Sequence, residues 1–344
     1  MKRKASLALC SIAVVSITAI LHAQQQDPDL LLQRVRDRLL ADLENLVRHT
    51  CVQTITRTYR RSSGQRVIPM PCPEVIRTRA SLAGEPPVLW RDRWRLDVAI
   101  AGREIYSWAG APQFGEGKIA DLMDYGAYAN GDFGPLIAGA IAGSGRTVYK
   151  GERVIEGRKL WEYTYDVPDF RSRYYFDTNA GQIAVAYDGT LLIDPDSSDL
   201  VRLTARTALS PAGPALSSTC QIISSVDYER VRMAQRDVLI PRKTEVRMVD
   251  NSGGESVIVT SYANCRQYLG ESVIRFDESA EQPRNLDQRR AETAPLPDGL
   301  TFRCRILTPL DDSAAAGNVV EASLRSPLTA SDGIVLAPPG ARIT

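Results

Sequence analysis

The stretch that decides the fold is residues 93–108, RWRLDVAIAGREIYSW. Apolar and polar side chains alternate from Trp94 to Ile100, which is the period of a strand with one buried face. The next two residues, Ala-Gly, indicate a turn, and Glu104–Trp108 then reads as a second strand. A strand, a short turn and another strand form a hairpin, so the stretch predicts an antiparallel sheet.

Similar strand patterns recur along the chain, separated by short turns rich in Gly, Pro, Asn or Asp. Alternating segments and short apolar runs predict strands at residues 161–167, 183–187, 191–193, 238–240, 244–248 and 257–259. The sequence therefore predicts an α+β fold, mainly antiparallel β, in which sequential hairpins build one large sheet.

Two kinds of helix are expected beside this sheet. Asp27 suits an N-cap and Pro28 the first helical position. One apolar stripe follows, made by Leu32, Val35, Leu39, Leu43 and Leu46. A Gly- and Ala-rich insertion, 112–145, contains two shorter helical segments, Lys118–Tyr125 and Pro135–Ile141. Those two segments either close one end of the sheet or form a mobile lid over an internal cavity.

The N-terminus has the three parts of a secretory signal. Three basic residues precede an uncharged apolar run, and Leu21-His22-Ala23 offers a cleavage site. We expect residues 1–23 to be removed and the mature protein to be periplasmic or extracellular; an uncleaved anchor is the alternative. Cleavage leaves 39 basic and 41 acidic residues, a net charge of −2. This balance gives no reason to expect nucleic-acid binding, and no later apolar run is long enough to span a membrane.

The chain is expected to contain two folded parts. Residues 24–277 form the main β domain, and residues 278–298 form a polar, Pro-containing linker. Residues 299–344 predict a small β module, too small to be stable without a neighbour. The turn just before Thr344 leaves open that a further strand is missing from this module.

Five cysteines follow the signal, and in an exported protein their default use is disulfide formation. We expect Cys51–Cys72, which closes a short loop, and Cys220–Cys265, which links two strand-like segments. Cys304 is the odd one out. Other pairings stay open, because sequence alone does not fix connectivity.

Few side chains suit catalysis or metal binding. His49 is the only histidine after the signal, and we expect it at the C-terminal end of the first helix, where its charge would favour the helix dipole. A Ser-His-Asp system or an ordinary zinc site therefore has too few residues. Asp194–Asp199 is an acidic cluster that predicts a hairpin turn with side chains bonded to the local backbone. We expect no enzyme activity, no metal and no cofactor.

Aromatic and apolar residues on the middle strands and the insertion are the best candidates for a ligand cavity. On a curved sheet, inward-facing side chains either fill a core or line a pocket. The cavity candidates are Trp94, Trp108, Leu136, Ile137, Trp161, Tyr163 and Tyr165.

Three local segments carry a resemblance to a known family. YYFDTNAG (174–181), LIDPDS (192–197) and VLIP (238–241) followed by residues 244–248 are similar to strand–turn–strand units of bacterial lipoprotein-carrier proteins of the LolA/LolB type. The resemblance spans about residues 28–277. It implies an unclosed, curved β half-barrel, covered by helices, whose concave face receives acyl chains. The disulfides and the C-terminal module depart from the family pattern.

Three functions follow as hypotheses. The first is a periplasmic protein that binds a hydrophobic ligand, such as a lipid or a lipoprotein acyl chain. The second is an envelope scaffold that contacts a protein partner through residues 299–344. The third is a glycan hydrolase that uses carboxylates alone, for which no pair can be named.

Overall fold

The computed structural model describes residues 27–44, 48–61, 69–81, 84–100, 103–111, 114, 119, 134–142, 146–172, 174–178, 181–208, 219–233, 235–267, 301–311, 313–330 and 333–344. The expected signal, the linker 278–298 and most of the segment 118–125 lie outside these residues. Within them, no helix is long and apolar enough to cross a membrane.

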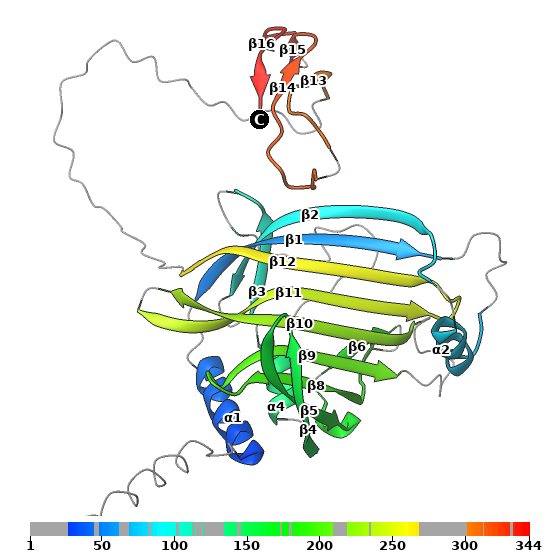
Figure 1. Cartoon of the computed structure of the whole chain (residues 1–344). Helices are drawn as coiled ribbons and strands as arrows, with labels where there is room; N and C mark the ends of the chain where they lie inside the picture. The colour runs from blue at the N-terminus through cyan, green and yellow to red at the C-terminus, as the bar shows by residue number, and fades with distance from the viewer. Residues whose placement is uncertain are drawn as a thin grey trace, which may run out of the picture.

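One curved, open sheet dominates the molecule (Figure 1). Its ten strands lie in the order β3-β2-β1-β12-β11-β10-β9-β8-β5-β4, and every neighbouring pair is antiparallel. The strands of this sheet are β1 (His49–Arg60), β2 (Val88–Ile100), β3 (Glu104–Trp108), β4 (Arg146–Ile155), β5 (Arg158–Val167), β8 (Tyr187–Asp194), β9 (Asp199–Ala208), β10 (Thr219–Met233), β11 (Arg236–Asp250) and β12 (Glu255–Gln267). The predicted antiparallel α+β fold is confirmed.

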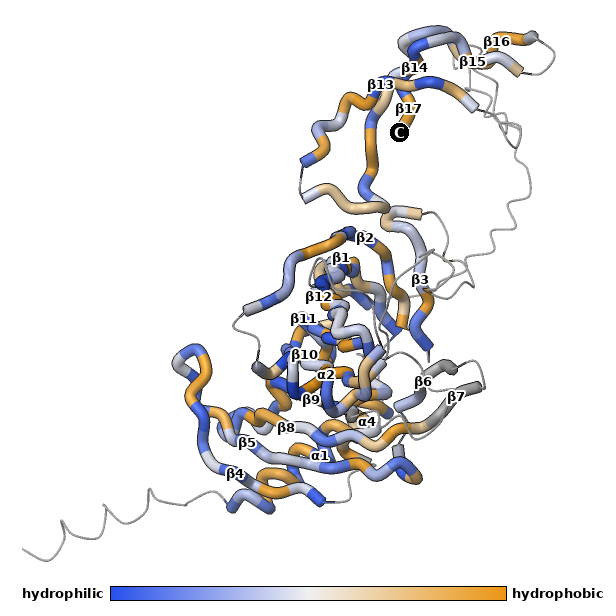
Figure 2. The backbone as a smooth tube through the Cα atoms, turned by 90° about the vertical axis from the view of Figure 1, so that its right-hand side faces the viewer, coloured by the Kyte–Doolittle hydropathy of each residue, from blue (hydrophilic) through white to orange (hydrophobic). Residues whose placement is uncertain are grey.

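Helix α1 (Pro28–Glu44) begins where the sequence predicts. The Asp27 side chain caps it by accepting a hydrogen bond from the Asp29 N–H (2.9 Å). Its buried side chains are Leu31, Leu32, Val35 and Leu39. Helix α4 (Pro135–Ala142) is the second predicted helix of the insertion. Both helices share one core cluster with strands β5, β8 and β9, and so cover the concave face of that part of the sheet (Figure 2).

Helix α2 (Cys72–Ala80) was not predicted from the sequence. Pro73 and Glu74 in its first turn, and Arg77 and Arg79 near its end, are ordinary helix-terminal signals. The helix is short and buries only Cys72 and Val75, so it carries too little apolar periodicity to stand out.

The position expected for His49 is wrong. It is the first residue of β1 and fully buried (0% exposed). Alternation along β1 places His49, Cys51, Gln53, Ile55 and Arg57 on the buried face. The histidine therefore belongs to the interior of the sheet, and the helix already ends at Glu44.

The structure has two disulfides, but the expected pairing is wrong. Cys51 pairs with Cys265 and Cys72 pairs with Cys220, while Cys304 is free and exposed. The strand order explains the difference: β12, which carries Cys265, lies directly beside β1, which carries Cys51. Cys72, at the start of α2, packs instead against Cys220 in a small cluster with Val75 and Val249. Closeness in sequence was a poor guide to closeness across the sheet.

Two polar turns of the large sheet are local structures held by side chains. In the β8–β9 turn, Asp194 Oδ1 accepts hydrogen bonds from the Asp196 and Ser197 N–H groups (2.9 and 3.2 Å). In the β11–β12 turn, Asp250 Oδ1 accepts from the N–H groups of Ser252 and Gly254 (2.8 and 2.9 Å). The acidic cluster 194–199 is thus a hairpin turn, as predicted.

Smaller sheets complete the described fold. β6 (Tyr175–Thr178) pairs with β7 (Gly181–Ala184). In the C-terminal module, one sheet has the order β13-β14-β17 and a second joins β15 to β16. Their bounds are β13 (Cys304–Ile306), β14 (Ala322–Leu324), β15 (Leu328–Thr329), β16 (Val335–Ala337) and β17 (Arg342–Ile343). The module lies beside β2 (Figure 1), with one backbone bridge between Trp94 and Ala316.

Candidate functional site

An aromatic floor covers the concave face where strands β4, β5 and β8 meet. Tyr149 packs against Trp161 and Tyr163, with ring centroids 5.1 and 5.3 Å apart. Tyr187 contacts Tyr165 edge-on, with centroids 6.1 Å apart. These rings share a face because each is an inward residue of its strand, and Tyr149 lies directly opposite Tyr163 in the register.

Hydroxyl groups at the edges of this floor are bonded to backbone oxygens. Tyr163 Oη donates to Pro28 O at 2.9 Å and so ties β5 to the start of α1. Tyr165 Oη donates to Thr204 O at 2.7 Å. Burial raises the pKa values of Tyr163, Tyr165 and Tyr187, and that of Tyr187 reaches about 12. The floor is therefore uncharged at neutral pH, which suits contact with apolar groups.

Helix α1 is held over the floor by charges as well as by apolar packing. Arg230 of β10 bonds Asp42 of α1 (2.8 Å) and Asp199 (2.8 Å), and Asp199 also pairs with Arg38 of α1 (3.2 Å). Burial disfavours the charge on Arg230, but its bonds to both carboxylates outweigh this and raise the pKa of the guanidinium. We call Asp42, Arg230, Asp199 and Arg38 the α1 ion-pair cluster.

Helix α4 has no such polar attachment, since its sequence, PLIAGAIA, contains no polar side chain. Ile137 and Ile141 supply its large buried groups. At Gly139, a Cβ would lie 2.6 Å from Tyr187 Oη, so the missing side chain lets the helix approach the aromatic floor closely. Helix α4 is thus a small-residue cover held by apolar contact.

A hollow of about 500 Å³ lies between α1, α4 and the edge strand β4. Leu32 and Ile141 are its apolar walls, and Thr147 of β4 borders it two residues from Tyr149. Its rim is polar and includes Asp29, Gln33, Arg36 and Asp37. Arg36 crosses from α1 to β4, where its guanidinium donates to Thr147 Oγ1 at 2.7 Å. The volume is within the range of small-molecule sites.

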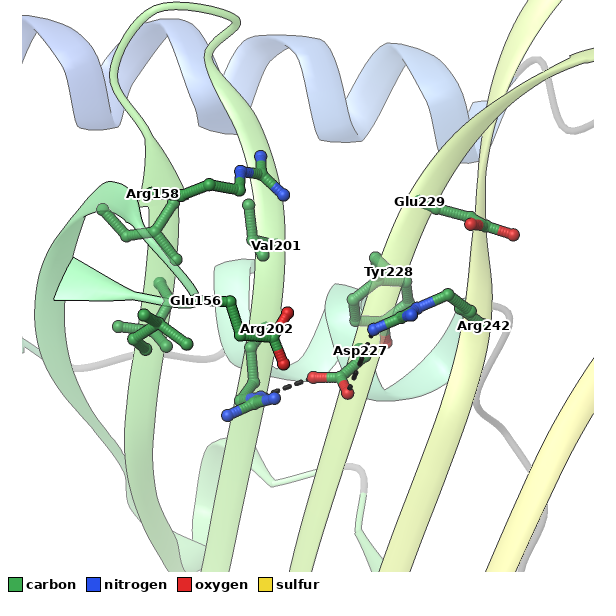
Figure 3. A pocket seen from close by; sticks show the side chains of 11 residues that line it. Glu156, Arg158, Val201, Arg202, Asp227, Tyr228, Glu229 and Arg242 are labelled. Atoms are coloured by element: carbon green, nitrogen blue, oxygen red, sulfur yellow. Dashed lines mark hydrogen bonds and ion pairs between the residues drawn. The ribbon is translucent and has the colours of Figure 1, made fainter. Parts of the chain in front are cut away.

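A second hollow of about 240 Å³ lies on the outer face of the sheet (Figure 3), where α1 appears behind the strands. Arg158, Arg202 and Arg242 alternate there with Glu156, Asp227 and Glu229. The Asp227 carboxylate lies between Arg202 and Arg242 and pairs with both. Because these charges balance one another, this hollow is a poorer candidate for an apolar ligand than the one beneath α1 and α4.

The predicted cavity residues fall into two groups. Leu136, Ile137, Trp161, Tyr163 and Tyr165 belong to the core cluster that α1 and α4 share with β5, β8 and β9. Trp94 and Trp108 lie at the other end of the sheet, where their rings stack with centroids 5.6 Å apart. Tyr149 and Tyr187 also belong to the floor but were not predicted from the sequence. Alternation placed Tyr187 on a strand, but only the strand order shows that it lies beside Tyr165.

Within the described residues, no group of three or more His, Cys, Asp or Glu side chains is placed to hold a metal ion. The two disulfides are typical of proteins that fold outside the cytoplasm.

No protein-family model matches the sequence, and no curated protein matches it either. Among solved structures, a DUF1329 family protein from Desulfovibrio piger is similar, with 11% identity over 74% of this chain and 100% of the other, at a TM-score of 0.32. A LolA superfamily protein from Nitrosomonas europaea is similar over 68% of this chain and 94% of its own, with 11% identity and a TM-score of 0.28. The lipoprotein LppX from Mycobacterium tuberculosis is similar over 71% of this chain and 98% of its own, with 12% identity and a TM-score of 0.23.

Proposed function

We propose that the protein is an extracytoplasmic binding protein for a hydrophobic ligand, of the acyl-chain class, and that the ligand lies on the aromatic floor beneath α1 and α4. The observation that carries this proposal is the pairing of an uncharged aromatic floor with a cover, α4, that has no polar attachment. The hollow bordered by Leu32 and Ile141 lies beside that cover.

The chemistry of the site favours an acyl chain with a polar end. Apolar surface removed from water contributes roughly 25 cal/mol per Å², so a chain on the floor gains affinity in proportion to its buried length. The polar rim of Asp29, Gln33, Arg36 and Asp37 gives a headgroup hydrogen-bonding partners at the surface. A ligand that displaces α4 replaces one apolar contact with another, which keeps the cost of opening low.

Titration of the mature protein with a fluorescent fatty acid tests the proposal. Ile141→Trp fills the hollow, and we expect it to weaken binding by roughly tenfold or more. Leu30→Trp is the matched control, because Leu30 lies on the outer side of α1, 54% exposed. Equal affinities for the wild type and both variants would exclude this site. No saturable binding to the wild type would reject the function.

A second variant tests the role of α4 as a cover. Gly139→Val places methyl groups against Tyr187 Oη, so we expect α4 to pack less closely and the fatty acid to associate faster. Ala138→Val, one residue earlier on a half-buried position of the same helix, should leave the association rate near that of the wild type. Stopped-flow fluorescence measures both rates. An unchanged rate in Gly139→Val would show that α4 does not control entry.

A further inference from the structure

The C-terminal module contacts the main sheet through the backbone of one strand edge. The Arg95 N–H donates to Ala316 O (2.7 Å), and the Ala316 N–H donates to Arg93 O (2.9 Å). These two bonds form a parallel bridge beside Trp94. At Gly317 (φ +90°), a Cβ would lie only 2.2 Å from Arg95 O, so glycine is needed for this approach.

The edge that receives this bridge is otherwise open along much of its length. Strand β3 pairs only with Leu96–Ile100, the second part of β2. Among the described strands, none pairs with the outer side of residues 88–95 (Figure 1). Within the described residues, the bridge to Ala316 is the one backbone pairing on that side. An open strand edge is a template for an added extended chain.

The two faces of this edge differ in chemistry. Arg91, Arg93 and Arg95 alternate with Trp90 and Trp94, so the cationic and aromatic side chains lie on opposite faces of β2. Arg91 and Arg95 are exposed, and within the described residues neither makes an ion pair. On the other face, Trp108 stacks on Trp94 and is still 38% exposed. A strand added here would place alternate side chains beside arginines and beside tryptophans.

The present occupant makes little use of either face. Residues 314–317 are Ala-Ala-Ala-Gly, without an acidic or large apolar side chain. Cross-strand pairs of opposite charge, or of aromatic with apolar groups, each stabilise a strand pair. A peptide with acidic and apolar side chains would therefore make more favourable cross-strand contacts with this edge than residues 314–317 do.

We propose that the outer edge of β2, from Val88 to Arg95, is a strand-addition site for an extended peptide that alternates acidic and apolar side chains, and that residues 314–317 occupy it in the free protein. The C-terminal module then acts as a tethered competitor that leaves the edge when the peptide binds.

The test uses the mature full chain and a fluorescein-labelled, nine-residue peptide that alternates aspartate with valine. Fluorescence anisotropy gives its affinity. Gly317→Val blocks the approach of the module, so the module no longer competes with the peptide for the edge. We expect the peptide to bind that variant roughly tenfold more tightly than the wild type, because the lost competitor is held by two backbone hydrogen bonds. Gly333→Val is the matched control, because Gly333 has the same kind of backbone (φ +84°) but open space around it. Its affinity should equal that of the wild type.

Charge and docking are tested separately. Arg91→Glu with Arg95→Glu should abolish binding of the aspartate peptide, and a peptide alternating lysine with valine should not bind the wild type. Hydrogen exchange at the Arg95 amide should be faster in Gly317→Val. If that variant does not fold by near-ultraviolet circular dichroism, Ala316→Pro removes the donor to Arg93 instead. Equal binding of the aspartate and lysine peptides to the wild type would overturn the proposal. It would also be overturned if removal of the bridge changed neither the affinity for the aspartate peptide nor the exchange rate of the Arg95 amide.

Discussion

The two halves of the large sheet are held together in different ways. Strands β1 and β12 are joined by Cys51–Cys265, and β10 is joined to α2 by Cys72–Cys220. Strands β4, β5, β8 and β9 contain no cysteine, and their concave face is covered by α1 and α4 through side-chain contacts alone. We call these the disulfide half and the helix-covered half.

Their concave faces also differ in polarity. In the disulfide half, polar side chains such as Gln53, Thr244 and Thr260 are buried among the apolar ones. In the helix-covered half, the floor is aromatic and its hydroxyls bond to backbone. The proposed ligand site lies in the half that contains no disulfide, so opening its helical cover would not require a disulfide to break.

The largest expected effect is loss of the Cys51–Cys265 disulfide. The two cysteines are 214 positions apart, but Cys72–Cys220 lies within that loop and shortens it to about 66 residues, for which the chain-entropy model gives about 4 kcal/mol. We expect Cys51→Ala with Cys265→Ala to lower the free energy of unfolding by roughly 3–5 kcal/mol in urea, with fatty-acid affinity retained by the folded protein. A large loss of affinity at equal folding would show that the two halves are not independent.

The next effect concerns a buried ion pair in the disulfide half. The Arg57 guanidinium is 1% exposed and donates to both oxygens of Asp92, at 2.9 and 2.5 Å. Asp92→Ala removes that carboxylate and leaves the cation buried beside Trp90 and Trp94, so we expect a loss of about 3 kcal/mol.

Asp188→Ala is its control in the helix-covered half. Asp188 pairs with Arg206 at 2.8 Å, but both side chains are more than half exposed, and exposed pairs contribute at most about 1 kcal/mol. Similar losses for the two variants in urea unfolding would show that burial does not govern the strength of these pairs.

High pH is expected to act on the helix-covered half. Burial raises the pKa of Tyr187 from 10.0 to about 12, so the folded protein favours the neutral phenol. This contribution is complete below pH 10 and is lost as the pH rises through about 12. The free energy of unfolding of the wild type should therefore fall between pH 10 and about pH 12. We expect that fall to be smaller in Tyr187→Phe by roughly 2 kcal/mol. Tyr175→Phe, at a 55% exposed position, should leave the decrease intact; an equal response in both variants would contradict the assignment.

The smallest expected effect is on the α1 ion-pair cluster. Arg230→Ala removes two contacts to carboxylates at a position 15% exposed, and we expect a loss of about 1–2 kcal/mol together with faster hydrogen exchange in α1. Arg232→Ala, two residues along β10, removes a pair with Asp237 in which both side chains are more than half exposed. It should cost less than about 1 kcal/mol. Unchanged exchange in α1 after Arg230→Ala would show that the apolar stripe alone holds the helix.

The sequence predicted the fold class because the signals that determine it are local. Trp94–Ile100 and Trp161–Val167 alternate clearly, and Asp27-Pro28 marks the start of α1. Helix α2 was missed because it buries only two of its residues. His49 was assigned to the end of the first helix, whereas α1 ends at Glu44 and His49 is the first residue of β1.

The site was harder to predict because it depends on strand order. Trp161, Tyr163 and Tyr165 could be named from alternation, but the contact of Tyr187 with Tyr165 requires β8 to lie beside β5. The same limit explains the disulfides: the four cysteines could be identified, whereas Cys51 meets Cys265 only because β12 returns next to β1. Local patterns predict which face a residue occupies, and the order of distant strands decides its neighbours.

The most direct test of the account is native mass spectrometry of the mature protein, purified from the periplasm without detergent and then titrated with palmitate. We predict one acyl chain bound per protein in the wild type and in Leu30→Trp, and a loss of that species in Ile141→Trp. A mass that stays free of ligand in the wild type throughout the titration, or equal binding in all three proteins, would contradict the claim that the floor beneath α1 and α4 holds a hydrophobic ligand.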